Sequence, residues 1–363
     1  MSMFNKLNRL WMRSLAKTGK SRIRAVSTLL KAVQTAPRRA RSTAKPKTPS
    51  VANMPTAPRR LREPQGGSWH SAIFAGAKLP VRHMRYRLFL PDTGSAGLVV
   101  MLHGCQQNAD DFAAGTGMHR LAAAKGYAVL YPEQSARSHP HRCWKWYDAA
   151  TQRGGGDAET IAAMIEMIVA RYAIDGSRVY VCGISAGAAM AHILALTHPH
   201  LMAAVGLHSG PVFGSARTAV GAYGVMQHGS ATPLAPMRAL LARQPGLPPV
   251  PAIIVGGGDD EVVRPVNQLQ LVRQCSELYR PGSLVAAPVQ AKPFGRVSKA
   301  WPRKRAMRIS DYTAGSAVMI RSVQIEGLGH AWSGGDEAFS FNARGPDAGK
   351  LMLEFFARHR RKI

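Results

Sequence analysis

The sequence predicts an α/β protein built on a doubly wound, mostly parallel sheet with helices on both faces. Two observations lead to this prediction. Short, almost wholly apolar runs recur along the chain, and stretches with helical periodicity separate them. Such runs are typical of strands covered on both faces, and their alternation with helices favours parallel strands joined by helical crossovers. The expected parallel strands are residues 98–102, 127–131, 179–182, 202–207 and 252–255.

The remaining elements follow from the same kinds of pattern. Apolar residues alternate with other residues over 84–90, which predicts a half-buried antiparallel strand. A basic cluster and several prolines punctuate residues 280–309, so we expect a surface excursion there, close to residue 330. The expected helices are residues 158–172, 186–196, 266–279 and 346–359, and a further strand is expected at 317–325.

Positive charge is concentrated near the N-terminus. The chain has 363 residues and a formal net charge of +28, and residues 1–62 hold sixteen Lys or Arg and no acid. The first residues predict a basic amphipathic helix, and the proline-rich residues 35–67 predict a disordered linker. We therefore divide the chain into a basic arm over residues 1–67 and a large folded domain over residues 68–363.

Two interpretations of this arm stay open. Clustered Lys and Arg could contact an anionic surface, such as a membrane or a granule coat, because they release its counterions. A solvated tail without a partner is the alternative. The chain carries no nucleic-acid-binding motif, so no specific nucleic-acid partner is expected.

Several classes of protein are excluded by composition. The four cysteines lack the paired spacing of a zinc site, so we expect no metal. No stretch of eighteen apolar residues exists, so we expect no transmembrane segment. The N-terminus lacks an apolar core followed by a small-residue cleavage site, so no cleavable signal peptide is expected.

The run Gly-Ile-Ser-Ala-Gly at residues 183–187 carries the most specific chemical signal. It follows an expected strand and precedes an expected helix, which is the context of the nucleophile elbow in α/β-hydrolases. The two glycines permit a strained turn, so the hydroxyl of Ser185 stands at the carboxyl edge of the sheet. Ser185 is therefore the predicted nucleophile.

A serine nucleophile needs a base, and the base needs a carboxylate that fixes its tautomer. In this fold they follow in the order serine, acid, histidine. The glycine-rich turn after the strand at 252–255 presents Asp259 and Asp260 at the same sheet edge, and we select Asp260, with Asp259 as the alternative. His330 lies in a glycine-flanked loop after the strand at 317–325 and is the predicted base.

The oxyanion hole is predicted from two backbone amides. One is the N–H of Ala186, the residue after the nucleophile. The other lies in the loop His-Gly-Cys-Gln-Gln at residues 103–107, where Cys105 is the expected donor. We interpret His103, which leads this turn, as structural support and not as a competing base.

Four segments in this order carry a family resemblance: residues 103–107, Arg-Cys-Trp-Lys-Trp at 142–146, the Ser185 turn, and the glycine-rich loop at 327–335. They resemble the poly(3-hydroxybutyrate) depolymerase family of esterases, whose relatives include feruloyl and acetylxylan esterases. The resemblance covers about residues 69–358. It implies an α/β-hydrolase fold, a triad of Ser185, Asp260 and His330, and cleavage of carboxylic esters.

The resemblance implies further features of the site. Cys105 and Cys143 are expected to pair as a disulfide, which would indicate an oxidising compartment; two buried thiols in a cytosolic enzyme are the alternative. Trp144 and Trp332 are expected to contribute to the substrate pocket, with aromatic core packing as the rival interpretation. The family implies an extracellular enzyme, and the missing signal peptide keeps a cytoplasmic location open.

This sequence departs from the family pattern in two informative places. Gly256, Gly257 and Gly258 precede the two aspartates, where relatives usually have a His-Gly-Asp-x-Asp turn. The chain also ends soon after its last helix, where polymer-degrading relatives carry a linker and a substrate-binding domain. Soluble or short oligomeric esters are therefore favoured over solid polyester.

These observations predict a serine esterase that forms an acyl-enzyme on Ser185 and needs no cofactor. The expected substrates are 3-hydroxyalkanoate-type polyesters or oligomers, or other short acyl or aryl esters. A peptidase or lactone hydrolase on the same fold is the nearest alternative. A non-catalytic protein that docks on a granule or another polyanion is the alternative from a different class.

Overall fold

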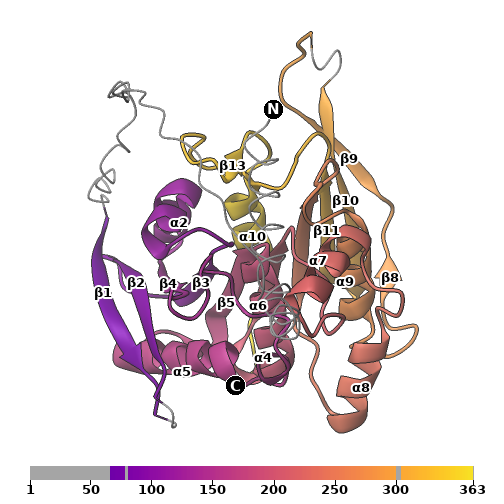
Figure 1. Ribbon diagram of the computed structural model, residues 1–363. Helices are drawn as coiled ribbons and strands as arrows, with labels where there is room; N and C mark the ends of the chain where they lie inside the picture. Colours follow the sequence, from indigo (N-terminus) through magenta and orange to yellow (C-terminus); the bar gives the residue numbers. More distant parts are fainter. Residues whose placement is uncertain (1–65, 78–80, 300–303, 363) are drawn as a thin grey trace, which may run out of the picture. The chain divides into compact units, whose positions relative to one another are not determined.

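One large sheet organises the part of the chain that the structure describes. The computed structural model describes residues 66–77, 81–299 and 304–362. Eleven strands within these residues form a sheet in the order β1-β2-β4-β3-β5-β6-β7-β11-β10-β8, and β9 pairs with β10 (Figure 1). The six strands from β4 to β11 in this order run parallel, and the strands at both edges are antiparallel. The predicted fold class is confirmed.

The elements have the following bounds. The strands of the main sheet are β1 (Gly67–Ala75), β2 (His83–Pro91), β3 (Gly97–Leu102), β4 (Tyr127–Glu133), β5 (Val179–Ile184), β6 (Ala204–His208), β7 (Ala252–Gly257), β8 (Val285–Ala286), β9 (Gln290–Phe294), β10 (Arg305–Ala314) and β11 (Ala317–Ile325). The α-helices are α2 (Ala109–Thr116), α3 (Met118–Ala123), α4 (Ala149–Gln152), α5 (Gly156–Arg171), α6 (Ala186–Thr197), α7 (Ala219–His228), α8 (Ala235–Arg243), α9 (Val266–Ser276) and α10 (Ala348–Phe356). A small parallel pair, β12 (Trp332–Ser333) and β13 (Asn342–Ala343), follows β11.

The five apolar runs that the sequence assigns to parallel strands are β3 to β7. Each residue of these strands is buried, because helices cover both faces of the sheet. One apolar cluster joins the sheet to α5 to α9, and a second joins its other face to α2, α3 and α10. The carboxyl ends of these parallel strands therefore meet at one edge of a rigid core.

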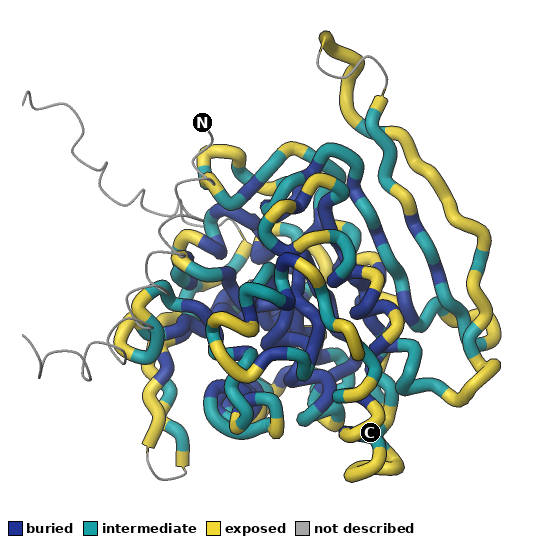
Figure 2. Tube along the Cα trace, turned by 45° about the vertical axis from the view of Figure 1, so that its right-hand side comes forward, coloured by how far each residue is buried: buried dark blue, intermediate teal, exposed yellow. Residues whose placement is uncertain are grey.

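The strands at the two edges of the sheet were not identified from the sequence. The expected surface excursion over residues 280–309 lies at the surface but is not irregular in its described residues, because β8, β9 and the start of β10 extend the sheet beyond β11. Figure 2 shows how exposed this outer part is, and each residue of β9 before Phe294 is exposed. A strand exposed on both faces lacks the apolar alternation that identifies strands. For the same reason the sequence does not identify β1 as a strand, because most of its residues are exposed.

The boundary of the folded domain also moves slightly. Gly67, which the sequence assigns to the linker, begins β1 and pairs with Pro91 of β2. The predicted amphipathic helix, and the predicted linker up to residue 65, lie outside the described residues. Each helix of the described part is too short or too polar to cross a membrane.

Candidate active site

Ser185 lies in a strained turn between β5 and α6. Its backbone has φ 57° and ψ −121°, a conformation that costs a non-glycine residue about 1 to 3 kcal/mol. The glycines on either side are required by contact, because a Cβ on Gly183 or Gly187 would collide with the carbonyl oxygen of Leu102 at the end of β3. Ser185 itself is only half-buried, so a ligand can reach it.

Asp260 and His330 meet at the same sheet edge. His330 Nδ1 lies 2.8 Å from Asp260 Oδ2, and only 12% of the histidine side chain and 1% of the aspartate side chain are exposed. The other oxygen, Oδ1, accepts from the backbone amides of Val262 and Val263 at 2.9 and 2.8 Å. These two donors fix the carboxylate, so one oxygen always faces the imidazole.

The electrostatics of Asp260 suit a permanent anion. Burial of the carboxylate alone would raise its pKa. The charge of His330 and the hydrogen bonds that the carboxylate accepts outweigh burial and hold the pKa below its ordinary value. The neighbouring Asp259 contributes its backbone amide, which donates to Leu328 O at 3.0 Å. Of the two aspartates, the structure brings Asp260 to His330.

Two residues that sequence reasoning missed connect the serine turn to this pair. The Ser185 amide donates to the carbonyl of His208, the last residue of β6, at 2.9 Å. The next residue, Ser209, has φ 48°, its Oγ lies 3.3 Å from His208 Nδ1, and its side chain helps to lower the pKa of Asp260. The position of both residues at the carboxyl end of a predicted strand was the available signal, because the same edge carries the other candidates.

His208 is held as a neutral ring beneath the site. Its side chain is fully buried, its Nε2 accepts from the Ser333 amide at 3.2 Å, and its ring stacks on Trp332 with centroids 5.2 Å apart. Burial lowers the pKa of His208 to about 3. In the described residues no hydrogen bond joins Ser185 Oγ to His330, so the serine is brought to the same edge as the pair but is not bonded to it.

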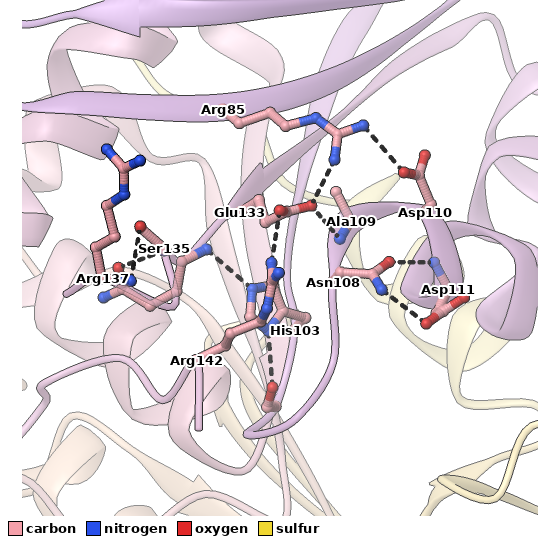
Figure 3. Close-up of polar contacts among 12 residues, drawn as sticks. Arg85, His103, Asn108, Ala109, Asp110, Asp111, Glu133, Ser135, Arg137 and Arg142 are labelled. Carbon is pink, nitrogen blue, oxygen red and sulfur yellow. Dashed lines mark hydrogen bonds and ion pairs between the residues drawn. The ribbon is translucent and has the colours of Figure 1, made fainter. Parts of the chain in front are cut away.

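The loop at residues 103–107 packs directly on the serine turn. A Cβ on Gly104 would lie 3.4 Å from Ile184, the residue before Ser185. His103 is fully buried, with Nδ1 2.7 Å from Gly104 O and Nε2 accepting from the Gln134 amide at 3.1 Å (Figure 3). Burial lowers the pKa of His103 to about 4, which leaves a neutral ring that shapes the loop.

Two backbone amides of this region are available to a ligand. The Ala186 N–H is at the first position of α6, where a helix offers no acceptor. The Cys105 N–H lies in the neighbouring loop, between Gly104 and Gln106. Across the described ranges, neither amide donates to a protein acceptor.

The buried carboxylate of Glu133 helps to hold the loop at residues 103–107 in place. Glu133, at the end of β4, accepts from the Ala109 amide at 3.1 Å and pairs with Arg142 Nη1 at 2.7 Å and Arg85 Nη1 at 3.3 Å (Figure 3). Arg142 precedes Cys143, which the structure joins to Cys105 by a disulfide with a Cα–Cα distance of 4.3 Å. The loop is thus tied to the core through both the disulfide and the Glu133 ion pairs.

The tryptophans predicted to line a substrate pocket pack in the core instead. Trp144 and Trp332 are fully buried, so neither ring offers surface to a substrate. Trp144 Nε1 donates to His103 O at 2.9 Å, and Trp332 packs between Phe112 and His208. The rings support the loop at residues 103–107 and the loop that carries His330 from inside the core. Both tryptophans lie close to the motifs along the chain, but this does not predict whether their rings face the core or the pocket.

No metal site accompanies these residues in the part of the chain described. Among the described residues, no three His, Cys, Asp or Glu side chains lie close enough together to hold one ion.

The sheet order and the strained turn after β5 place this chain in the α/β-hydrolase class. The solved acetyl xylan esterase from Aspergillus awamori shares the fold with a TM-score of 0.62 and 21% identity, over 80% of this chain and 99% of that chain. A family model described as esterase PHB depolymerase matches residues 84–289. The chain belongs to this family of esterases.

Individual relatives extend the comparison. Poly(3-hydroxyalkanoate) depolymerase C of Paucimonas lemoignei is 34% identical over 189 residues, which are 51% of this chain and 45% of the relative. Probable acetylxylan esterase A of Neosartorya fischeri is 36% identical over 116 residues, 31% of each chain. Feruloyl esterase B of Neurospora crassa is 34% identical over 132 residues, 35% of this chain and 44% of the relative. The chain matches less than half the length of each.

Proposed function

We propose that this protein is a serine esterase that hydrolyses carboxylic esters through an acyl-enzyme on Ser185. The observation that carries the proposal is the 2.8 Å contact between His330 Nδ1 and the buried Asp260, at the sheet edge where Ser185 occupies a strained turn. A carboxylate on Nδ1 leaves Nε2 as the proton acceptor, which is the arrangement that activates a serine.

The proposed reaction has two steps. Ser185 Oγ attacks the ester carbonyl while His330 Nε2 takes its proton, and the imidazolium then gives that proton to the departing alcohol. Water, deprotonated by the same nitrogen, attacks the acyl-enzyme and releases the acid. In both steps the negative oxygen would accept hydrogen bonds from the Ala186 and Cys105 amides. Neither amide has an acceptor among the described residues, which supports this role.

An ester substrate is favoured over an amide or a lactone. Membership of an esterase family supports this choice, as do relatives whose names describe depolymerase, acetylxylan esterase and feruloyl esterase activities. We propose 3-hydroxyalkanoate oligomers and short acyl or aryl esters as the substrate class. A panel of acetyl, butyryl, feruloyl and 3-hydroxybutyrate oligomer esters, with a matched amide and lactone, tests it; faster turnover of the amide would assign a peptidase.

The role of Ser185 is tested by Ser185→Ala, with Ser276→Ala on α9 as the matched control. Turnover of p-nitrophenyl butyrate should fall by more than about 10⁴-fold in the first variant, because members of a triad act as a unit. The control should keep the parent rate. Parent-like activity of Ser185→Ala would end the proposal.

We also propose that the enzyme works in an oxidising compartment. The disulfide between Cys105 and Cys143 supports this location, because such bonds persist outside the reducing cytosol. Thiol labelling of the protein taken directly from its native cells tests it. Labelling of Cys105 and Cys143 without prior reduction would place the enzyme in the cytoplasm.

A further inference from the structure

A cleft lies away from the candidate active site. This cleft, of about 550 Å³, is formed by α4, the loop that follows β6, and α8 with the segment before it. Its size falls within the range of ordinary small-molecule sites, about 300 to 1,000 Å³. Neither Ser185, Asp260 nor His330 lines it.

Three arginines from separate parts of the chain line this cleft. They are Arg153 after α4, Arg217 in the loop after β6, and Arg243 at the end of α8. All three are exposed, and no Asp or Glu is among the lining residues. The cleft therefore concentrates positive charge that its own walls do not neutralise.

These three arginines differ from the surface arginines that are paired with carboxylates. Arg238, also on α8, pairs with Glu277 at 2.8 Å, and Arg344 pairs with Glu337 at 2.9 Å. None of the three cleft arginines forms an ion pair within the ranges that the structure describes. A planar guanidinium with several donors is suited to bidentate contact with carboxylate or phosphate oxygens.

The walls of the cleft are held by the amide side chains of three glutamines, two of them buried. Gln274 Nε2 donates to Phe213 O at 3.0 Å and to Pro233 O at 2.7 Å, and Gln270 exchanges hydrogen bonds with the backbone of Ser230. Gln152 Nε2 donates to Ala216 O at 3.1 Å, which ties α4 to the loop after β6. The cleft is therefore formed before a ligand arrives, which reduces the cost of ordering on binding.

The remaining lining completes a site for a polar anion. Ser215, Ser230 and Thr232 bring hydroxyl groups, and Pro236 and the alanines of α4 and α8 provide small apolar walls. The Phe213 ring packs on His192, two turns of α6 beyond Ser185, with centroids 6.0 Å apart. The cleft thus lies beside the middle of α6 and not at its N-terminus.

We propose that this cleft is an anion-binding site for a small ligand with two or more carboxylate or phosphate groups. The inference is independent of the proposed esterase activity. Three arginines that line one cleft supply the guanidinium groups for a multivalent oxyanion, and the hydroxyl groups suit its remaining oxygens. Two chemical sources are distinguished by experiment: a tricarboxylate, represented by citrate, and a polyphosphate, represented by tripolyphosphate.

The test must resolve individual arginines, because the sixteen Lys and Arg of residues 1–62 would attract any added polyanion through their charge alone. Phenylglyoxal modifies accessible arginines, and peptide mass spectrometry reports the rate at each one. With the full chain at constant ionic strength and a ligand at ten times its dissociation constant, modification of Arg153, Arg217 and Arg243 should slow by about tenfold. Modification of the exposed Arg273 and Arg280, which lie outside the cleft, should not change.

Two double variants distinguish a specific binding site from nonspecific attraction by positive charge. Arg217→Gln with Arg243→Gln should abolish the protection of Arg153, whereas Arg273→Gln with Arg280→Gln should preserve it. Protection by citrate alone assigns the carboxylate source, and protection by tripolyphosphate alone assigns the phosphate source. Equal protection of cleft and control arginines, or none with either ligand, would overturn the site.

Discussion

Replacement of Asp260 by asparagine tests the catalytic assignment in the most detail. Asparagine has nearly the same shape, and its carbonyl oxygen can still accept from the Val262 and Val263 amides at the 2.9 and 2.8 Å positions. The amide nitrogen then faces His330 Nδ1, where the carboxylate oxygen now lies at 2.8 Å. A donor in that place favours the tautomer that is protonated on Nε2, and that tautomer cannot accept the serine proton.

The expected loss follows from this reversal. The variant loses a charge-assisted hydrogen bond and the stabilisation of the imidazolium, and a reversed tautomer in a triad lowers kcat by about 10⁴-fold, or about 5 kcal/mol. KM should change little, because Asp260 is buried and acts through His330. A merely structural role would instead lower the melting temperature and leave the kcat of the folded fraction unchanged.

The assay is steady-state hydrolysis of p-nitrophenyl butyrate, with thermal melting to establish that each variant is folded. Asp259→Asn is the matched control, one residue away in the same turn, and should keep its kcat within about threefold, since substitutions away from buried contacts have small effects. The reasoning is refuted if Asp259→Asn loses activity while Asp260→Asn keeps it.

Three further predictions concern stability, the loop at residues 103–107 and the basic arm. Burial lowers the pKa of His192 to about 4, so the unfolded chain takes up a proton at this residue below about pH 6.5 while the folded chain resists it, and stability falls as pH drops. The free energy of unfolding of His192→Leu minus that of the parent should therefore rise by about 2 kcal/mol from pH 7 to pH 4.5, as measured by urea unfolding. The same difference at both pH values would contradict this. Glu133→Gln, which removes the ion pairs beneath the loop, should lower kcat by about tenfold with KM nearly constant, and a rise in KM alone would exclude a positioning role. Deletion of residues 1–65 should leave hydrolysis of soluble esters intact, and loss of activity in a folded truncation would show that the arm belongs to the catalytic unit.

The centre of the fold could be predicted from the sequence because its signals are local. A strand buried on both faces leaves an apolar run, and the strained turn at Ser185 leaves a glycine on each side. The outer strand β9 has no apolar run in its sequence, since it is exposed and carries both Lys292 and Pro293. An edge strand can be recognised mainly from its partner, which only the fold supplies.

The candidate site was predictable as an order of residues but not as a set of contacts. Asp259 and Asp260 are adjacent, and the backbone of the turn decides which carboxylate faces His330. His208 and Ser209 belong to no motif, and only the pairing of β6 with β5 and β7 brings them between Ser185 and Asp260. The burial of Trp332 likewise follows from packing that the sequence does not record.

The most direct measurement is the site of covalent attachment by an active-serine reagent. A fluorophosphonate traps the nucleophile of a serine hydrolase as a stable adduct, and peptide mass spectrometry locates it. The proposed mechanism predicts one adduct, on Ser185, that disappears in Ser185→Ala and forms much more slowly in Asp260→Asn. An adduct on another serine, or undiminished labelling of Ser185→Ala, would contradict it.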